Sequence, residues 1–170
     1  MKYIYTSLLL LTFYLVSYGQ PGSRIGHIDM NTILQALPEV DSLQAVLKKE
    51  SNEMASVYEE MQVDYNNLVN DYQSGLSTFS SLERKTREDE IIDKQKRMSE
   101  FEQNANLTLQ QRNRELMQPV YTRIDQAIRR IATREGLEYV LDLSTGTVVF
   151  TSDDSRDINQ EVIDEVQSGQ

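Results

Sequence analysis

The feature that most constrains this chain is a stripe of apolar and aromatic side chains between residues 38 and 72, spaced by alternating steps of three and four. Only the polar Glu50 and one repeated step of four interrupt the pattern. This spacing places the stripe on one face of an α-helix and is close to a coiled-coil heptad. At 1.5 Å per residue the helix would be roughly 50 Å long, more than a small globular domain usually buries. The stripe consists of Val40, Leu43, Leu47, Met54, Val57, Met61, Tyr65, Leu68 and Tyr72.

The stripe ends in a segment, 73–80, that is rich in glycine and hydroxyl residues and predicts a turn. Ser80 and Glu83 have the spacing of a capping box, in which each side chain satisfies a backbone N–H at the start of a helix. The chain is therefore expected to reverse its direction here and to begin a second helix.

A second amphipathic stripe follows the turn, but polar residues such as Gln95 and Arg112 lie at or near its apolar face. Faces of this kind pack less tightly against a partner helix. The two stripes together predict an antiparallel coiled-coil hairpin, an arm over residues 38–118 whose helices splay toward a tip near 73–80. The apolar positions of the second stripe are Ile91, Met98, Phe101, Ala105, Leu109 and Leu116.

The segments on either side of the arm, 24–37 and 119–170, are expected to form one small β-rich body. Residues 24–29 predict a short strand, and Pro38 fits the first turn of the helix that follows because its missing N–H is not needed there. Pro119 is expected to kink the second helix without ending it, since it lacks an N–H and crowds the preceding turn.

The helix beyond Pro119 carries a wider apolar stripe, as expected of a helix that packs on a sheet, and Gly136 ends it. Residues 137–143 and 147–151 predict a β-hairpin, and Asp157 with Gln160 predicts the cap of a last helix. The chain is thus predicted to be an α+β protein, with a long helical hairpin projecting from a small body. The wider stripe consists of Val120, Ile124, Ala127, Ile128 and Ile131.

Residues 1–19 have the pattern of a signal peptide, with a basic start at Lys2, an apolar run over 4–16 and small residues before Gly19. The apolar run is shorter than the ~20 residues that cross a bilayer, which favours cleavage after Gly19 over an uncleaved anchor. A lipid anchor would need a cysteine, and the chain has none. We therefore expect an exported protein.

Composition argues against several classes of function. The formal net charge of −10 disfavours nucleic acid as a partner, and the absence of cysteine excludes thiolate metal sites and thiol nucleophiles. His27 is the one histidine, and in a short strand we interpret it as a packed or edge residue rather than a catalytic base. The chain has no glycine-rich phosphate loop for ATP. No enzymatic activity, cofactor or metal is expected.

The order and spacing of several segments resemble the Skp/OmpH family of periplasmic chaperones. The resemblance implies a homotrimer, assembled through the body, whose helical arms enclose a cavity that holds unfolded outer-membrane β-barrel proteins without ATP. The segments that carry it are Arg24–Met30, Leu37–Glu39, Leu116–Pro119, Gly136–Asp142, Val148–Phe150 and Asp157–Val162.

Flexible methionine and tyrosine side chains on the first arm helix are candidates for contact with such clients, because they adapt to partners of many shapes. A second reading of the same hairpin is a non-catalytic envelope spacer or adaptor that binds one specific partner. The candidate client-facing residues are Met54, Tyr58, Met61, Tyr65 and Tyr72.

The charge of this chain departs from the basic character of the best-known family members. Its acidic surface argues against direct binding of lipopolysaccharide or an anionic membrane. Arg84, Lys85 and Arg87 just past the tip are a candidate anion site. Acidic residues are interleaved with these cations, so a solvated helix face with spaced ion pairs is the favoured interpretation.

Overall fold

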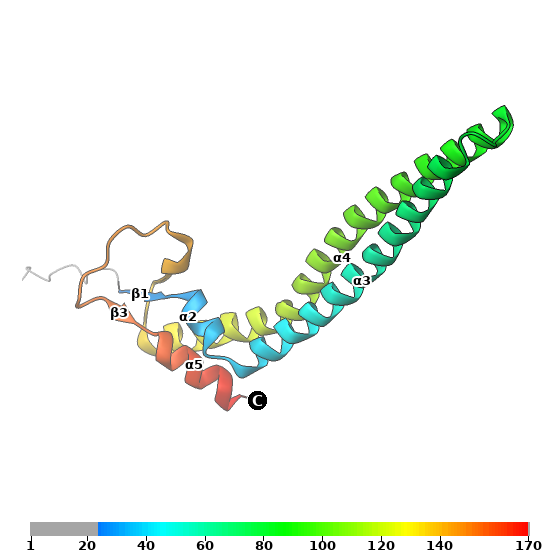
Figure 1. The fold of residues 1–170 in the computed structure, drawn as a ribbon. Helices are drawn as coiled ribbons and strands as arrows, with labels where there is room; N and C mark the ends of the chain where they lie inside the picture. Colours follow the sequence, from blue (N-terminus) through cyan, green and yellow to red (C-terminus); the bar gives the residue numbers. More distant parts are fainter. Residues whose placement is uncertain (1–23, 170) are drawn as a thin grey trace, which may run out of the picture.

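A computed structural model of the chain describes residues 24–169. Two long helices, α3 (Pro38–Gly75) and α4 (Ser81–Glu135), form an antiparallel hairpin that projects from a small body made by both ends of the described chain (Figure 1). The architecture confirms the predicted fold class of a helical arm on a small strand-containing body. The predicted leader and its cleavage after Gly19 lie outside the described residues.

The ends of the arm helices follow from local chemistry. Pro38 occupies the first turn of α3, as predicted. At the start of α4 the Ser80 hydroxyl accepts the Glu83 N–H, and the Glu83 carboxylate accepts the Ser80 N–H at 2.7 Å, so the predicted capping box is confirmed. Gly136 ends α4 in the left-handed conformation (φ 66°), which a residue with a Cβ adopts only at a cost.

Pro119 lies inside α4, and the helix continues through it as expected. Figure 1 shows α4 changing direction between its yellow portion in the body and its green portion in the arm. The two helices then run side by side to the tip, where Tyr72 of α3 donates a hydrogen bond to Glu88 of α4. The prediction that the helices splay toward the tip is therefore wrong, because polar contacts across the seam replace the missing apolar ones.

The body contains a three-stranded parallel sheet in the order β2-β1-β3. The central strand β1 (Ile25–Ile28) pairs with β2 (Tyr139–Asp142) on one side and with β3 (Arg156–Asp157) on the other. Gly26 lies opposite both Val140 and Arg156. This arrangement joins the two ends of the described chain in one sheet.

A short helix, α2 (Met30–Gln35), follows β1 and was not anticipated from the sequence. The Asp29 carboxylate caps it by accepting the N–H groups of Asn31 and Thr32. Helix α5 (Asn159–Ser168) closes the body. The predicted Asp157–Gln160 box does not form: Asp157 accepts the Asn159 N–H, while Gln160 donates to Asp164 one turn further on.

The predicted β-hairpin between residues 137–143 and 147–151 is wrong. Residues 139–142 form β2, which pairs with β1, while 147–151 form no strand. The Asp142 carboxylate accepts the N–H groups of Ser144 and Met30, which begins a short 3-10 helix (Leu143–Thr145) in place of a tight turn. Gly146, at φ 68°, ends this helix, and the chain then leaves the sheet.

One hydrophobic core holds these elements together, where the end of α4 packs against α2, α5 and the start of α3. The predicted stripe on α4 supplies its centre: Ile124, Ala127 and Ile131 are fully buried. The arm has almost no core of its own, since Met98 is the one buried apolar residue on α4 before Met117. Stability is therefore concentrated in the body.

Replacing Ile124 by alanine should lower the free energy of unfolding by about 2–5 kcal/mol, because the removed atoms leave a cavity in a close-packed core. The matched control is Ile92→Ala on the same helix, where the side chain is 63% exposed and the change should stay within about 0.5 kcal/mol. Urea unfolding followed by circular dichroism measures both. Equal losses in the two variants would contradict a core confined to the body.

Candidate functional site

The arm is the candidate functional site, and polar contacts tie its two helices together along one edge. Ion pairs join Glu50 to Arg112 at 3.1 Å and Asp64 to Lys94 at 2.9 Å, and nearer the body Glu39 pairs with Arg123. The carboxylates belong to α3 and the lysine and arginine side chains to α4. Within each helix, successive partners are separated by close to a whole number of helical turns. The three pairs therefore lie along one side of the hairpin, which we call the ion-pair edge.

On the ion-pair edge, Arg123 is stabilised in its charged form by its partner. The hydrogen bond from Arg123 to Glu39 raises the pKa of the guanidinium above its usual value. These pairs are partly exposed, so each contributes little to the free energy of unfolding, but together they specify which residues of α3 face which residues of α4. The antiparallel register of the arm is therefore set by charge as well as by its apolar stripe.

The tip is closed by aromatic packing. The rings of Tyr72 and Phe79 stack with their centroids 6.5 Å apart, and Phe79 covers Gly75 so closely that a Cβ at that position would overlap the ring. The hydrogen bond from the Tyr72 hydroxyl to the Glu88 carboxylate raises the pKa of Tyr72. The hydrogen bonds that Glu83 accepts from Ser80 lower the pKa of Glu83, so the cap stays charged.

Hollows lie on both sides of the seam: two, lined mostly by charged side chains that include Asp64 and Lys94, lie on the ion-pair edge, and two lie on the side away from it. A hollow of about 210 Å³ lies between the helices where Tyr58 faces Phe101 and Leu109, and a second of about 300 Å³ extends toward the tip between Tyr65 and Met98. Tyr58 and Glu102 line both of them. The two hollows are therefore adjacent, and we call them together the open groove.

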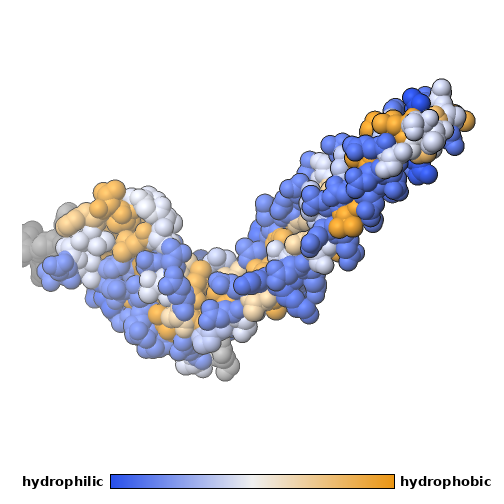
Figure 2. Space-filling model, in the orientation of Figure 1, coloured by the Kyte–Doolittle hydropathy of each residue, from blue (hydrophilic) through white to orange (hydrophobic). Residues whose placement is uncertain are grey.

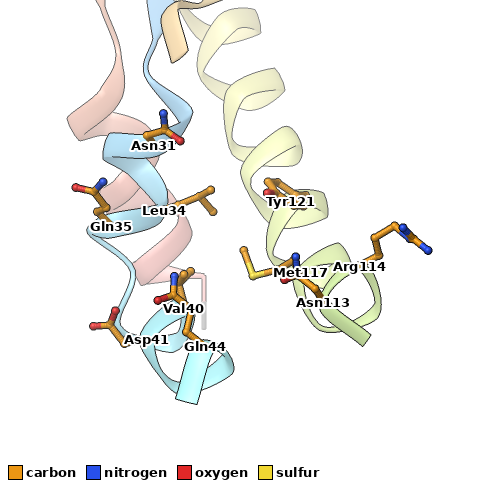
Figure 3. A pocket seen from close by; sticks show the side chains of 10 residues that line it. All are labelled: Asn31, Leu34, Gln35, Val40, Asp41, Gln44, Asn113, Arg114, Met117 and Tyr121. Carbon is orange, nitrogen blue, oxygen red and sulfur yellow. The ribbon is translucent and has the colours of Figure 1, made fainter. Parts of the chain in front are cut away.

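A larger hollow of about 620 Å³ lies at the base of the arm, between α2, α3 and α4. Figure 3 shows Leu34 of α2 and Met117 of α4 pointing toward one another inside it, while Arg114 points away. Amide side chains such as Gln44 and Asn113 make up much of the remaining lining. This hollow is thus of mixed polarity and belongs to the junction of arm and body.

The predicted client-facing residues all lie half-buried along the seam between α3 and α4. Met54 and Tyr58 line the lower hollow of the open groove, Tyr65 lines the upper one, and Tyr72 lies at the tip. Met61 is half-buried in the same stripe. Their contact with clients stays a prediction, and the structure adds that only part of each side chain is accessible.

Sequence reasoning missed a second set of apolar side chains that are well exposed on the arm. Val57 belongs to the predicted stripe, but the others fall outside both stripes, so periodicity gave no reason to single them out. They are spread over both helices and the tip, and Figure 2 shows orange patches of this kind among the blue polar surface of the arm. The exposed residues are Val46, Val57, Val63, Leu76, Leu82, Ile92 and Leu107.

The candidate anion site past the tip is only partly available. Arg84 donates a hydrogen bond to the Phe79 carbonyl, and Arg87 pairs with Glu90 at 3.1 Å. Lys85 is exposed and has no ion-pair partner among residues 24–169. Further along α4, Arg97 pairs with Asp93. The spaced ion pairs that the sequence favoured are present, while anion binding at the tip stays a prediction.

Within residues 24–169 no group of histidine, cysteine or carboxylate side chains is arranged to hold a metal ion. His27 is half-buried in the central strand, and its carbonyl accepts the Ile158 N–H. Over the same residues, no helix has the length and apolar character that a membrane crossing requires.

Comparison with known proteins defines the class of the chain. Chaperone protein Skp of Pectobacterium atrosepticum is 24% identical over 87% of this chain and 88% of its own length. Chaperone protein Skp of Photorhabdus laumondii is 27% identical over 73% of this chain and 75% of its own. The fold also matches the crystal structure of a putative outer membrane chaperone (OmpH-like) from Caulobacter crescentus, with a TM-score of 0.70 and 11% identity over 91% of this chain and 89% of that one.

The family model described as outer membrane protein (OmpH-like) matches residues 24–166, nearly all of the described chain. The protein therefore belongs to the OmpH-like family, which confirms the resemblance drawn from the sequence. The matches support a chaperone role, and because the family consists of chaperones, the protein is not an enzyme.

If the ion-pair edge sets the register of the arm, Glu50 and Arg112 should show a favourable coupling in a double-mutant cycle. We expect about 0.2–1 kcal/mol at low salt, with a smaller value at high salt, because the pair is partly exposed and screened. Urea unfolding of Glu50→Gln, Arg112→Gln and the double variant measures it. The exchanged pair, Glu50→Arg with Arg112→Glu, should regain part of the loss, and strict additivity of the single changes would contradict the assignment.

Proposed function

We propose that the protein is an ATP-independent holdase of the bacterial periplasm, which binds unfolded outer-membrane β-barrel proteins between helical arms and prevents their aggregation. The observation that carries the proposal is the arm itself: a long hairpin that stands clear of the body and has little buried core (Figure 1). The chaperone names of its relatives and the predicted leader support the same reading.

The surface of the arm suits weak contact with many unfolded chains. Its exposed apolar residues are dispersed among charged ones, so the arm offers apolar contacts without one large patch that would aggregate. Half-buried aromatic and methionine side chains beside the seam add adaptable surface. Binding that is spread over many small contacts needs no nucleotide for release.

A homotrimer assembled through the body would complete this proposal. The sheet leaves the outer side of β2 unpaired among the described residues, and exposed strand edges favour pairing with another chain. Nearby, Val149 is 95% and Phe150 is 80% exposed, and Figure 2 shows this loop as an orange patch at the upper left of the body. Contacts between copies at this patch would place three arms around a common cavity.

The acidic charge restricts the proposal to protein clients. The chain carries a net charge of −10, and two of the three candidate cations near the tip, Arg84 and Arg87, already contact Phe79 and Glu90. Like charges repel, so direct binding to lipopolysaccharide or an anionic membrane is not part of the proposed function.

The purified protein, without ATP, should suppress the aggregation of a urea-unfolded outer-membrane β-barrel protein on dilution. Light scattering measures the effect, and adding ATP should not change it. Equal scattering with and without the protein would overturn the holdase assignment. Capture from an envelope extract should return many outer-membrane proteins, whereas one dominant protein would favour the spacer or adaptor.

Replacing Val149 and Phe150 by serine should convert a trimer into monomers, because these exposed side chains would lose their apolar contact with a neighbouring copy. Sedimentation velocity measures the oligomeric state. Leu82→Ser, at a tip residue that is 76% exposed, is the matched control and should leave the trimer intact. A monomeric unsubstituted protein would contradict the proposed cavity.

A further inference from the structure

The two edges of the arm differ in what they offer to a partner. On the ion-pair edge, contacts between Glu50 and Arg112 and between Asp64 and Lys94 bridge the helices and occupy the polar groups there. On the opposite edge the open groove contains no cross-helix ion pair among the described residues. The hollows on the ion-pair edge are lined mostly by charged side chains, so a partner there would meet or displace these charges, whereas the groove is lined mainly by apolar and neutral polar side chains.

The open groove presents aromatic, thioether and neutral polar surface. Tyr58 and Phe101 line its lower hollow, and Tyr65 with Met98 lines the upper one. The remaining lining consists mainly of small or amide side chains, so an extended chain can enter without meeting a bulky obstacle. Side chains of this kind accept apolar groups by packing and cations over their aromatic faces.

The charge in the groove is negative only. Glu102, which lines both hollows, is the one charged side chain in them and has no ion-pair partner among residues 24–169. The acidic residues of α3 between 50 and 72 lie outside the lining of the groove, and Glu50 and Asp64 are already paired on the ion-pair edge, so Glu102 supplies the charge of the groove itself. A basic segment would therefore be attracted to the groove and an acidic one repelled.

The same charge decides against a second copy of this chain as the occupant. Another arm would bring an equally acidic α3 against the groove, and like charges placed side by side disfavour association. An extended segment of a foreign polypeptide that alternates aromatic and basic residues matches both the aromatic lining and the negative charge of the groove. Its aromatic groups fit the hollows, while its cations meet Glu102.

Resting on the proposed holdase function, we propose that clients lie along the open groove and not along the ion-pair edge, and that aromatic segments rich in lysine or arginine are the preferred ligands. The ion-pair edge then serves to keep the two helices in register while the groove is occupied. The groove is thus the preferred surface of the arm for such segments, and the dispersed exposed apolar residues add weaker contacts elsewhere.

The position of the client can be tested with two matched labels, because the chain contains no cysteine. Asn106 lines the open groove, while Asn104 is an exposed residue two positions away on the same helix and points to another face. Asn106→Cys and Asn104→Cys, each carrying a benzophenone photo-crosslinker, are mixed with a peptide of alternating tyrosine and lysine. We expect a crosslink yield at least about fivefold higher from position 106, and equal yields would overturn the proposed location.

The preferred charge can be tested on the same groove. The lysine peptide should bind at least about fivefold more tightly than its glutamate counterpart, as measured by fluorescence anisotropy in low salt. Glu102→Gln should reduce the affinity for the lysine peptide, while Glu100→Gln, whose carboxylate pairs with Lys96 outside the groove, should not. Tighter binding of the glutamate peptide, or equal effects of the two substitutions, would overturn the charge preference.

These outcomes are separable from failure of the holdase assignment. Light scattering with an unfolded β-barrel protein is run on the same two labelled variants. Suppressed aggregation with equal crosslinking at both positions would overturn the groove and leave the holdase standing. If the unlabelled protein fails to suppress aggregation of the β-barrel protein, the proposed function is overturned, regardless of the peptide crosslinking and affinity results.

Discussion

The antiparallel pairing of α3 with α4 is the constraint on which the rest of the structure depends. The chain leaves the body through α3 and must return through α4 in a register that brings β2 and β3 beside β1. Apolar residues alone specify this register poorly, because polar side chains interrupt the seam. The pairs Glu50–Arg112 and Asp64–Lys94 help to specify the register, since a shift of either helix would separate opposite charges.

Stability and binding surface are consequently divided between the two parts of the molecule. The body contains almost all fully buried apolar side chains, with Ile124 and Ile131 at its centre. The arm contributes little buried area and keeps its apolar groups partly exposed. A chaperone that must contact many unfolded chains benefits from this division, because its binding surface does not have to serve as its core.

Features that depend only on neighbouring residues within one helix were predicted correctly from the sequence. Pro38 and the Ser80–Glu83 box begin their helices as expected, because both act within a single turn. The hairpin at 137–151 and the splayed tip were predicted wrongly, because both depend on distant partners. Residues 139–142 pair with β1, more than a hundred residues earlier, and Tyr72 finds Glu88 across the turn.

Sequence alone therefore determined that the protein is a long helical hairpin on a small α+β body and pointed to its family, because periodicity, caps and motif order are all linear properties. It also named Met54, Tyr58 and Tyr65 as candidates for client contact, because methionine and tyrosine side chains adapt to partners of many shapes. Only the tertiary structure decided that one edge of this arm is bridged by ion pairs and that the other carries a groove with a mainly aromatic and neutral polar lining. That difference arises when side chains of two helices meet in one particular register, which no single helix specifies.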